Sequence, residues 1–315
     1  MRTVKTLLQA AAACLLLLAM ACGDLSQVVD IPLPEHEPLP AVTVDLRSGD
    51  TAVYARVALS RGVLDPETAT DLTAWLALTR DGEPVVEREI ALDRSDGRTS
   101  ELPLPAALPG AAADYRLSVR VGGFQEVTAE QRMPAPFTYR LVSYEADGAV
   151  NADGYRVDEM KLDLDDDGAT TDYYGVRLVT RPGDALNCYQ VWTANDDTRR
   201  EVCDTFYNDR TEELYLTSQD PVLKPSSGYG MVFTDDAFNG TTYRVRVLAD
   251  NYDRAPLRLE VYRLTEDAYR YALSRQAYED AGDNPFAEPV NVHQNVDGGY
   301  GHFIVAQRQS EELER

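Results

Sequence analysis

The strongest constraint on the fold is an alternation of apolar and polar residues with a period of two, which recurs between residues 41 and 264. Successive side chains of a β-strand point to opposite faces of a sheet, so this alternation predicts strands with one buried face. Clear examples are the runs VTVDL, AVYARVAL and YRLSVRV. Dipeptides typical of tight turns, such as Asp81-Gly82 and Gly122-Gly123, separate the runs. The pattern therefore predicts a mainly β protein.

The spacing of these runs predicts two antiparallel β-sandwich domains. Residues 41–134 are expected to form a small sandwich, immunoglobulin-like or prealbumin-like, with Trp75 in its core. Pro134 and Pro136 then interrupt the alternation, and we place the domain boundary there. Residues 135–305, rich in tyrosine and β-branched residues, are expected to form the larger second sandwich.

One helix is predicted near the C-terminus, over residues 266–281. Thr265 can cap its first N–H groups, and Gly282 is a suitable stop. Apolar residues recur on one face at helical spacing, so we expect that face to pack on the second sandwich. Residues 306–315, which end in SEELER, are expected to form a flexible tail.

The N-terminus has the order of an export signal. Residues 1–21 combine two basic residues, an uncharged apolar run and the small-residue sequence Ala19-Met20-Ala21, followed directly by Cys22. This pattern resembles a bacterial lipoprotein signal, in which Cys22 carries the lipid; an ordinary secretory peptide or a buried helix is the alternative. Residues 22–40 then contain four prolines and are expected to be an extended tether.

Charge limits the classes of partner. The chain has 53 acidic and 30 basic residues, a formal net charge of −23. Such a negative field repels nucleic acid and anionic lipid headgroups, so neither is expected as a partner. It favours solubility, and it would also suit a cationic ligand or divalent cations. We interpret most of the excess as a solvated acidic surface.

The cysteines are consistent with export. Cys14 is removed with the leader and Cys22 is the proposed lipid site, which leaves Cys188 and Cys203. A single remaining pair at short spacing in an exported chain is expected to form a disulfide.

The sharpest metal candidate is the segment DLDDDGATTDYY. Asp163, Asp165 and Asp167 alternate before Gly168, and Asp172 follows, as in the first half of an EF-hand calcium loop. However, Tyr174 occupies the position of the bidentate glutamate, and the flanks have strand patterns. Either a structural calcium ion binds Asp163, Asp165, Asp167 and Asp172, or the segment is an acidic hairpin turn, which the flanks favour. No other cofactor is expected.

Signals for catalysis are weak. The three histidines, His36, His293 and His302, are not paired at metal-ligand spacing. The sequence contains no nucleophile elbow, zinc-protease, phosphate-loop or dinucleotide motif. We therefore expect a non-enzymatic protein. The many tyrosines could present an aromatic face to sugars, but packing between strands accounts for them more simply.

The segment between residues 266 and 303 carries two further motifs, N-P-F-x-E-P-V and N-V-x-G-G-x-G-x-F, after a tyrosine-rich helix. Together with LSRGVLDP, DYY at residues 172–174 and FTDDAFNGTTY at residues 233–243, they resemble the domain of unknown function 4249 family of Bacteroidota lipoproteins. The motif residues that carry the resemblance are Asn284, Pro285, Phe286, Glu288, Pro289, Asn295, Gly298, Gly299, Gly301 and Phe303.

Read physically, the motif predicts a strap that locks the helix to the sandwich, which we favour over a ligand-binding loop. The prolines would hold an extended crossing, Phe286 would be a buried anchor, and the glycines would permit tight turns or close backbone approach.

The resemblance implies location more than activity. Members of the family look like outer-membrane lipoproteins and are often encoded beside TonB-dependent receptors. We accordingly expect a lipid-anchored outer-membrane protein, on the cell surface rather than the periplasmic face, that acts as an accessory or ligand-binding partner of such a receptor. A structural envelope lipoprotein without a soluble ligand is the alternative, and a carbohydrate-binding or carbohydrate-active protein is the weakest.

Overall fold

The computed structural model describes residues 36–62, 72–93, 99–192, 199–208, 211–282 and 286–314, of which 186–192 and 199–208 are described by their backbone alone. The strands and helices of these ranges belong to the unit Pro38–Arg315. The prediction of a mainly β protein with antiparallel sheets and a C-terminal helix is confirmed. Within the described ranges, no helix combines the length and apolar character that a bilayer crossing requires.

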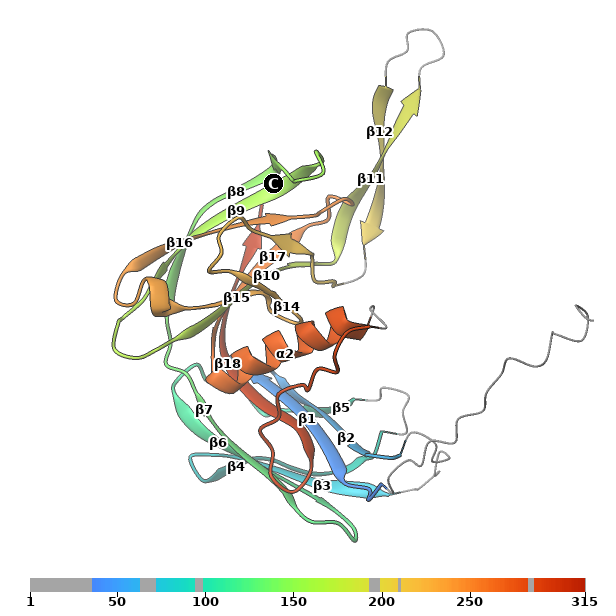
Figure 1. Ribbon diagram of the computed structural model, residues 1–315, viewed down its shortest axis with the longest axis vertical. Coiled ribbons are helices and arrows are strands. Elements are labelled where there is room, and N and C mark those ends of the chain that lie inside the picture. Colours follow the sequence, from blue (N-terminus) through green and yellow to red (C-terminus); the bar gives the residue numbers. More distant parts are fainter. Residues whose placement is uncertain are drawn as a thin grey trace, which may run out of the picture. The chain divides into compact units, whose positions relative to one another are not determined.

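An eight-stranded sheet is the largest sheet of the described residues (Figure 1). Its strand order is β14-β15-β10-β17-β18-β1-β2-β5. The strands are β1 (Pro40–Arg47), β2 (Ala52–Leu59), β5 (Ser100–Pro103), β10 (Tyr173–Thr180), β14 (Lys224–Ser226), β15 (Gly230–Thr234), β17 (Leu257–Leu264) and β18 (Tyr300–Leu313).

Strand β18 joins the two halves of this sheet. Its first half pairs in parallel with β1, from Ala41↔Tyr300 to Arg47↔Ala306, and its second half pairs antiparallel with β17, up to Leu257↔Leu313. The two predicted sandwiches therefore share one sheet instead of having two sheets each. Parallel pairing of β1 with β18 connects residues far apart in the chain, which a local alternation pattern does not predict.

The prediction of a flexible tail over residues 306–315 is wrong for most of its length. Residues 306–313 form the second half of β18, and Leu313 is buried in the second core. The polar character of this stretch has a structural reason: Glu311 and Glu312 lie opposite β17, and Glu312 forms an ion pair with Arg181 at 2.7 Å.

The first core lies between the eight-stranded sheet and a sheet of order β4-β3-β6-β7. The latter consists of β3 (Thr73–Arg80), β4 (Glu83–Ala91), β6 (Ala113–Val121) and β7 (Val127–Met133). Ala74, Leu76 and Leu78 of β3 are fully buried, as the alternation predicts. Trp75 lies on the opposite face of β3 from these residues and is 40% exposed, so the prediction that it lies in the core is wrong.

The second core lies between the eight-stranded sheet and a sheet of order β13-β16-β9-β8. Its strands are β8 (Thr138–Val150), β9 (Arg156–Asp165), β13 (Leu216–Thr217) and β16 (Thr242–Ala249). One end of this core is aromatic, because the rings of Tyr174, Phe233, Phe238 and Tyr243 contact one another, with Phe238 and Tyr243 stacked at 4.2 Å.

Helix α2 (Glu266–Gly282) confirms the predicted helix and packs on strands β10, β14, β15, β17 and β18 (Figure 1). The Thr265 hydroxyl accepts a hydrogen bond from the N–H of Ala268 at 3.2 Å, which is the expected cap. Ile304 and Ala306 of β18 pack under α2, whereas Phe303 and Val305 belong to the first core. The helix therefore covers the face of the eight-stranded sheet opposite the cores.

A hairpin of β11 (Gly183–Trp192) and β12 (Arg199–Asn208) forms a separate two-stranded sheet (Figure 1). Its backbone register places Cys188 opposite Cys203.

Candidate functional site

Two connections between the sheets of the second core meet at one corner. Residues 166–172 link β9 to β10, and residues 235–241 link β15 to β16. β9 neighbours β16 in one sheet and β10 neighbours β15 in the other, so the connections cross side by side. A Cβ on Gly168, whose φ is +67°, would lie 2.7 Å from the Cα of Gly240. A side chain at Gly168 would therefore separate the connections.

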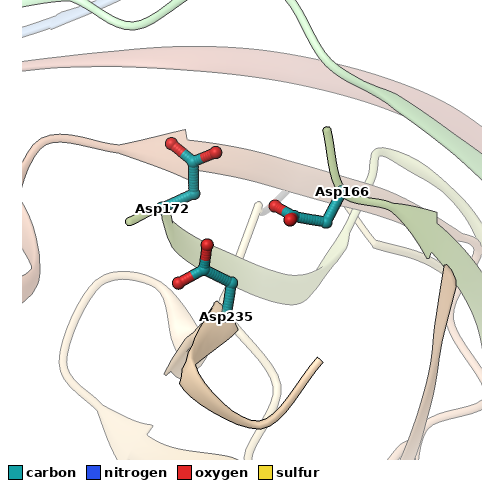
Figure 2. Close-up of side chains that lie close together, drawn as sticks. All are labelled: Asp166, Asp172 and Asp235. Atoms are coloured by element: carbon teal, nitrogen blue, oxygen red, sulfur yellow. The ribbon is translucent and has the colours of Figure 1, made fainter. Parts of the chain in front are cut away.

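Three aspartates of these connections form what we call the acidic cluster: Asp166, Asp172 and Asp235. One carboxylate oxygen of each lies within 4.8 Å of those of the others. Figure 2 shows the three side chains lying close together on the two connections. Asp172 and Asp235 are buried, and Asp166 is half-buried.

Asp166 ties the two connections together. Its Oδ2 accepts hydrogen bonds from the N–H of Gly168 at 3.0 Å and from the N–H of Gly240 at 2.6 Å. Its Oδ1 accepts a hydrogen bond from the hydroxyl of Tyr174 at 2.8 Å. Burial, followed by the bond to Asp166, raises the pKa of Tyr174, so the phenol stays a neutral donor.

Asp172 is held by an arginine. Arg263 of β17, itself buried, donates from Nε to Oδ1 at 3.0 Å and from Nη2 to Oδ2. The hydroxyl of Thr170 adds a longer contact to Oδ1 at 3.3 Å. This two-point contact with a guanidinium compensates the negative charge of one of the three carboxylates.

Asp235 differs from the other two aspartates because no described residue donates a hydrogen bond to its carboxylate. It begins the short helix η1 (Asp235–Ala237) and is fully buried, and within the described ranges neither of its carboxylate oxygens has a hydrogen-bond partner. Its backbone is engaged, since its N–H donates to the carbonyl of Asp172 at 3.2 Å. Burial, with added repulsion from Asp166 and Asp172, raises the pKa of the Asp235 carboxyl group.

The predicted calcium ligands do not come together. Asp172 alone of the four joins the acidic cluster. Asp163 and Asp165 lie within β9, on the face opposite the core residues Leu162 and Leu164, and Asp167 follows the end of that strand. Asp163 is bound by arginines of β8 and β16. Asp165 and Asp167 are exposed. Asp165 accepts a hydrogen bond from a threonine hydroxyl at 2.7 Å, and Asp167 accepts one from the N–H of Ala169 at 2.9 Å.

Sequence reasoning missed Asp166 and Asp235. Asp166 lies inside the run DLDDDG but outside the alternating spacing that suggested an EF-hand loop. Asp235 lies in FTDDAFNGTTY. That segment and DYY both carry the family resemblance, but that they lie side by side follows only from the sheet order.

Residues 286–299 of the C-terminal motif, here called the strap, contact both α2 and the first core. The Asn295 side chain makes two hydrogen bonds with the backbone of Phe303, donating to the carbonyl at 2.7 Å and accepting the N–H at 2.8 Å. A Cβ on Gly298 would lie 2.3 Å from the carbonyl oxygen of Glu126, just before β7, and a Cβ on Gly299 would lie 2.3 Å from that of Pro40, the first residue of β1. A Cβ on Gly301 would lie 1.9 Å from the carbonyl oxygen of Val42.

The first part of the motif is placed differently. Phe286 is 93% exposed, so the prediction of a buried anchor is wrong, and Val296 is the strap residue that packs against the first core. Glu288 and Pro289 are exposed. Asn284 and Pro285 lie outside the described residues.

His293 and His302 also serve the helix and the strap. The Nε2 atom of His293 lies 2.7 Å from Oδ1 of Asp267 in the first turn of α2. His302 is buried, its ring centroid 3.9 Å from that of Tyr271 on α2 and its Nε2 3.2 Å from Oδ1 of Asp45. Both imidazoles are therefore engaged in packing α2 against its surroundings.

The cysteines are only partly described. Cys22 lies outside the described residues, and the side chains of Cys188 and Cys203 are not described. Directly opposite residues of antiparallel strands have Cα atoms about 4.5–5.5 Å apart, which lies within the span of a disulfide. The register of β11 and β12 thus permits the predicted bond.

Comparison with protein-family models identifies the family of the chain. A family model described as "Domain of unknown function (DUF4249)" matches residues 28–312, a range that contains both cores, the acidic cluster and the strap. The family resemblance noted in the sequence is confirmed. None of the curated proteins matches the chain.

Proposed function

The chain belongs to the DUF4249 family, and from this premise we propose that it is a non-enzymatic lipoprotein, anchored in the outer membrane by a lipid on Cys22. In this role it would serve as an accessory or ligand-binding partner of a TonB-dependent receptor. The observation that carries the proposal is the leader of residues 1–21, with Ala19-Met20-Ala21 directly before the cysteine.

The start of the folded unit supports an anchor at Cys22. Strand β1 begins at Pro40, so residues 23–39 remain between the lipid site and the first strand. At about 3.1 Å per residue in polyproline geometry, this spacer would reach up to about 50 Å. The acidic domains could then stay clear of anionic lipid headgroups, which their charge repels.

The contacts of three polar side chains argue against a catalytic role for these residues. His293 contacts Asp267, and His302 is buried against Tyr271, so both rings stabilise the position of α2. Asp172 is compensated by Arg263. These residues are committed to structural contacts, whereas catalysis needs groups free to meet a substrate.

A disulfide in the hairpin β11–β12 would agree with an exported location. A two-stranded ribbon is marginally stable alone, and a disulfide between Cys188 and Cys203 would fasten it. Such bonds form and persist in oxidising compartments.

The anchor is tested with two matched cysteine variants. Wild-type protein and Cys14→Ser, which changes the leader only, are expected in the detergent phase after phase separation of membranes. Cys22→Ser is expected in the aqueous phase. Equal detergent partitioning of Cys22→Ser and wild type would refute the lipid anchor.

The partnership is tested with the native lipoprotein. Affinity purification from detergent-solubilised membranes is expected to recover a β-barrel receptor in stoichiometric amount. Reproducible absence of a receptor would contradict the accessory role and favour a structural envelope lipoprotein. Protease treatment of intact cells should degrade the described domains if they face outward.

A further inference from the structure

Asp235 is the member of the acidic cluster whose side chain has no partner among the described residues. Its carboxylate is fully buried, and neither oxygen has a hydrogen-bond partner among the described residues. Burying a carboxylate without donors is strongly unfavourable, so native proteins pair such a group, coordinate it to a metal or protonate it. An unsupported carboxylate beside two others is a feature that a cation would explain.

The charges around Asp235 leave room for a divalent cation. Arg263 is committed to Asp172, and the hydrogen bonds to Asp166 come from uncharged donors. Three carboxylates and one guanidinium leave two negative charges uncompensated within the cluster. Asp167, 3.7 Å from Arg263, adds further negative charge at the rim.

The geometry of the cluster suits coordination of one ion. Two oxygens bound to the same Ca²⁺ are separated by at most twice the metal–oxygen distance, which is about 4.6–5.2 Å. Oxygens of the three aspartates lie within 4.8 Å of one another. The two connections are also fixed close together by the hydrogen bond from Gly240 to Asp166.

We propose that Asp166, Asp172 and Asp235 bind one Ca²⁺ ion. The ligands are hard carboxylate oxygens, without the imidazole or thiolate that zinc and copper favour. Mg²⁺ requires shorter bonds, near-ideal octahedral geometry and several retained waters, which two buried carboxylates suit less well. Ca²⁺ accepts six to eight oxygens in irregular arrangements, so waters would complete its shell.

The bound ion would have a structural effect. It would join the connection after β9 to the connection after β15 and so fasten the two sheets of the second core at one corner. The neighbouring aromatic residues Tyr174 and Phe233 belong to that core. This site does not depend on the proposed lipid anchor or receptor, and the two proposals can fail separately.

The test uses the mature full-length lipoprotein, purified in detergent and freed of divalent ions with a chelator. Isothermal titration with CaCl₂ is expected to show one saturable site, with a Kd on the order of 0.1–1 mM, as in extracellular calcium modules. At a hundredfold excess over Kd, Ca²⁺ should raise the Tm by about 5–10 °C. MgCl₂ at the same concentration should raise it much less.

Two variants with the same charge change locate the site. Asp235→Asn should abolish the Ca²⁺-dependent rise in Tm, because the amide removes one anionic ligand. The control is Asp236→Asn, at an exposed residue whose carboxylate accepts a hydrogen bond from the Thr234 hydroxyl at 2.8 Å. This variant should retain the Ca²⁺-dependent rise in Tm. Asp166→Asn replaces Asp235→Asn if the latter does not fold.

Three results would overturn the proposal. One is the lack of saturable Ca²⁺ binding by the wild-type protein. Another is an unchanged Ca²⁺ response in Asp235→Asn, which would place the ion elsewhere. The third is equal stabilisation by Mg²⁺, which would contradict the assignment of the metal.

Discussion

Asn295 offers the sharpest test of the strap, because its side chain takes the place of a neighbouring strand. The pairing of β18 with β17 begins at Ala306, so Phe303 has β1 on one side and the strap on the other. The amide of Asn295 bonds the N–H and carbonyl of Phe303 at 2.8 and 2.7 Å. Phe303 itself is fully buried in the first core.

Asn295→Ala removes both bonds and leaves two backbone groups of Phe303 without partners. Each unsatisfied buried group costs about 1–3 kcal/mol, so for the two groups we expect the free energy of unfolding to fall by about 2–6 kcal/mol. Asn295→Asp keeps the acceptor, but it loses the donor and faces the Phe303 carbonyl and Asp267 with a negative charge, so it should be at least as destabilising.

Equilibrium unfolding in urea, followed by circular dichroism, measures this difference from the midpoint and slope. The matched control is Asn291→Ala, an exposed asparagine of the same strap, which should change the free energy of unfolding by less than about 0.5 kcal/mol. If Asn295→Ala lowered the free energy of unfolding by less than about 0.5 kcal/mol as well, the view that this amide completes the edge of β18 would be refuted.

Three further predictions concern other contacts. Intact, unreduced protein should show no free thiol at Cys188 or Cys203 by mass spectrometry after alkylation, and loss of that disulfide should destabilise by about 3 kcal/mol. Burial opposes ionisation of Asp267, but hydrogen bonds from its neighbours outweigh burial and lower the pKa of its carboxyl group from the ordinary value of 3.8. The stability that the ionised carboxylate contributes is therefore present above pH 3.8 and is lost as the pH falls through the lowered pKa. Asp267→Asn should accordingly make the free energy of unfolding depend less on pH below 3.8. Gly301→Ala should lower the free energy of unfolding by about 3 kcal/mol or prevent folding, because its Cβ would lie 1.9 Å from a β1 carbonyl oxygen and its φ is +113°. The control is Gly122→Ala, whose Cβ would have no atom within 4 Å and which should be tolerated. Urea unfolding measures both variants.

Local patterns in the sequence predicted what is local in the fold. Alternation located the strands around Val42 and Leu117 because each strand buries one face. The helix over residues 266–281 followed from its cap and periodicity, and the structure places it at Glu266–Gly282. These features depend on residues a few positions apart.

Features that depend on distant residues could not be predicted in this way. The parallel pairing of β1 with β18 makes one sheet from two expected sandwiches, and it turns a polar tail into a strand. Glu311 and Glu312 looked like solvated tail residues because their pairing with β17 is invisible in the local pattern. Phe286 was expected to be an anchor on residue type alone, yet it is exposed.

The acidic cluster illustrates the same limit. The sequence placed a calcium candidate around the connection that supplies Asp166 and Asp172, but the EF-like spacing selected Asp163, Asp165 and Asp167, which lie outside the acidic cluster. Asp235 enters the cluster only because β15 pairs with β10 and β16 pairs with β9. Sheet order, rather than spacing in the chain, determines which carboxylates meet.

The most direct test of the proposed function is the mass of the N-terminal peptide of the native protein, isolated from membranes. The account predicts a chain that begins at Cys22 and carries a thioether-linked diacylglycerol on its sulfur, with further acylation, such as palmitate, adding to the mass. A mature chain that begins at another residue, or an unmodified Cys22 in protein from membranes, would contradict it.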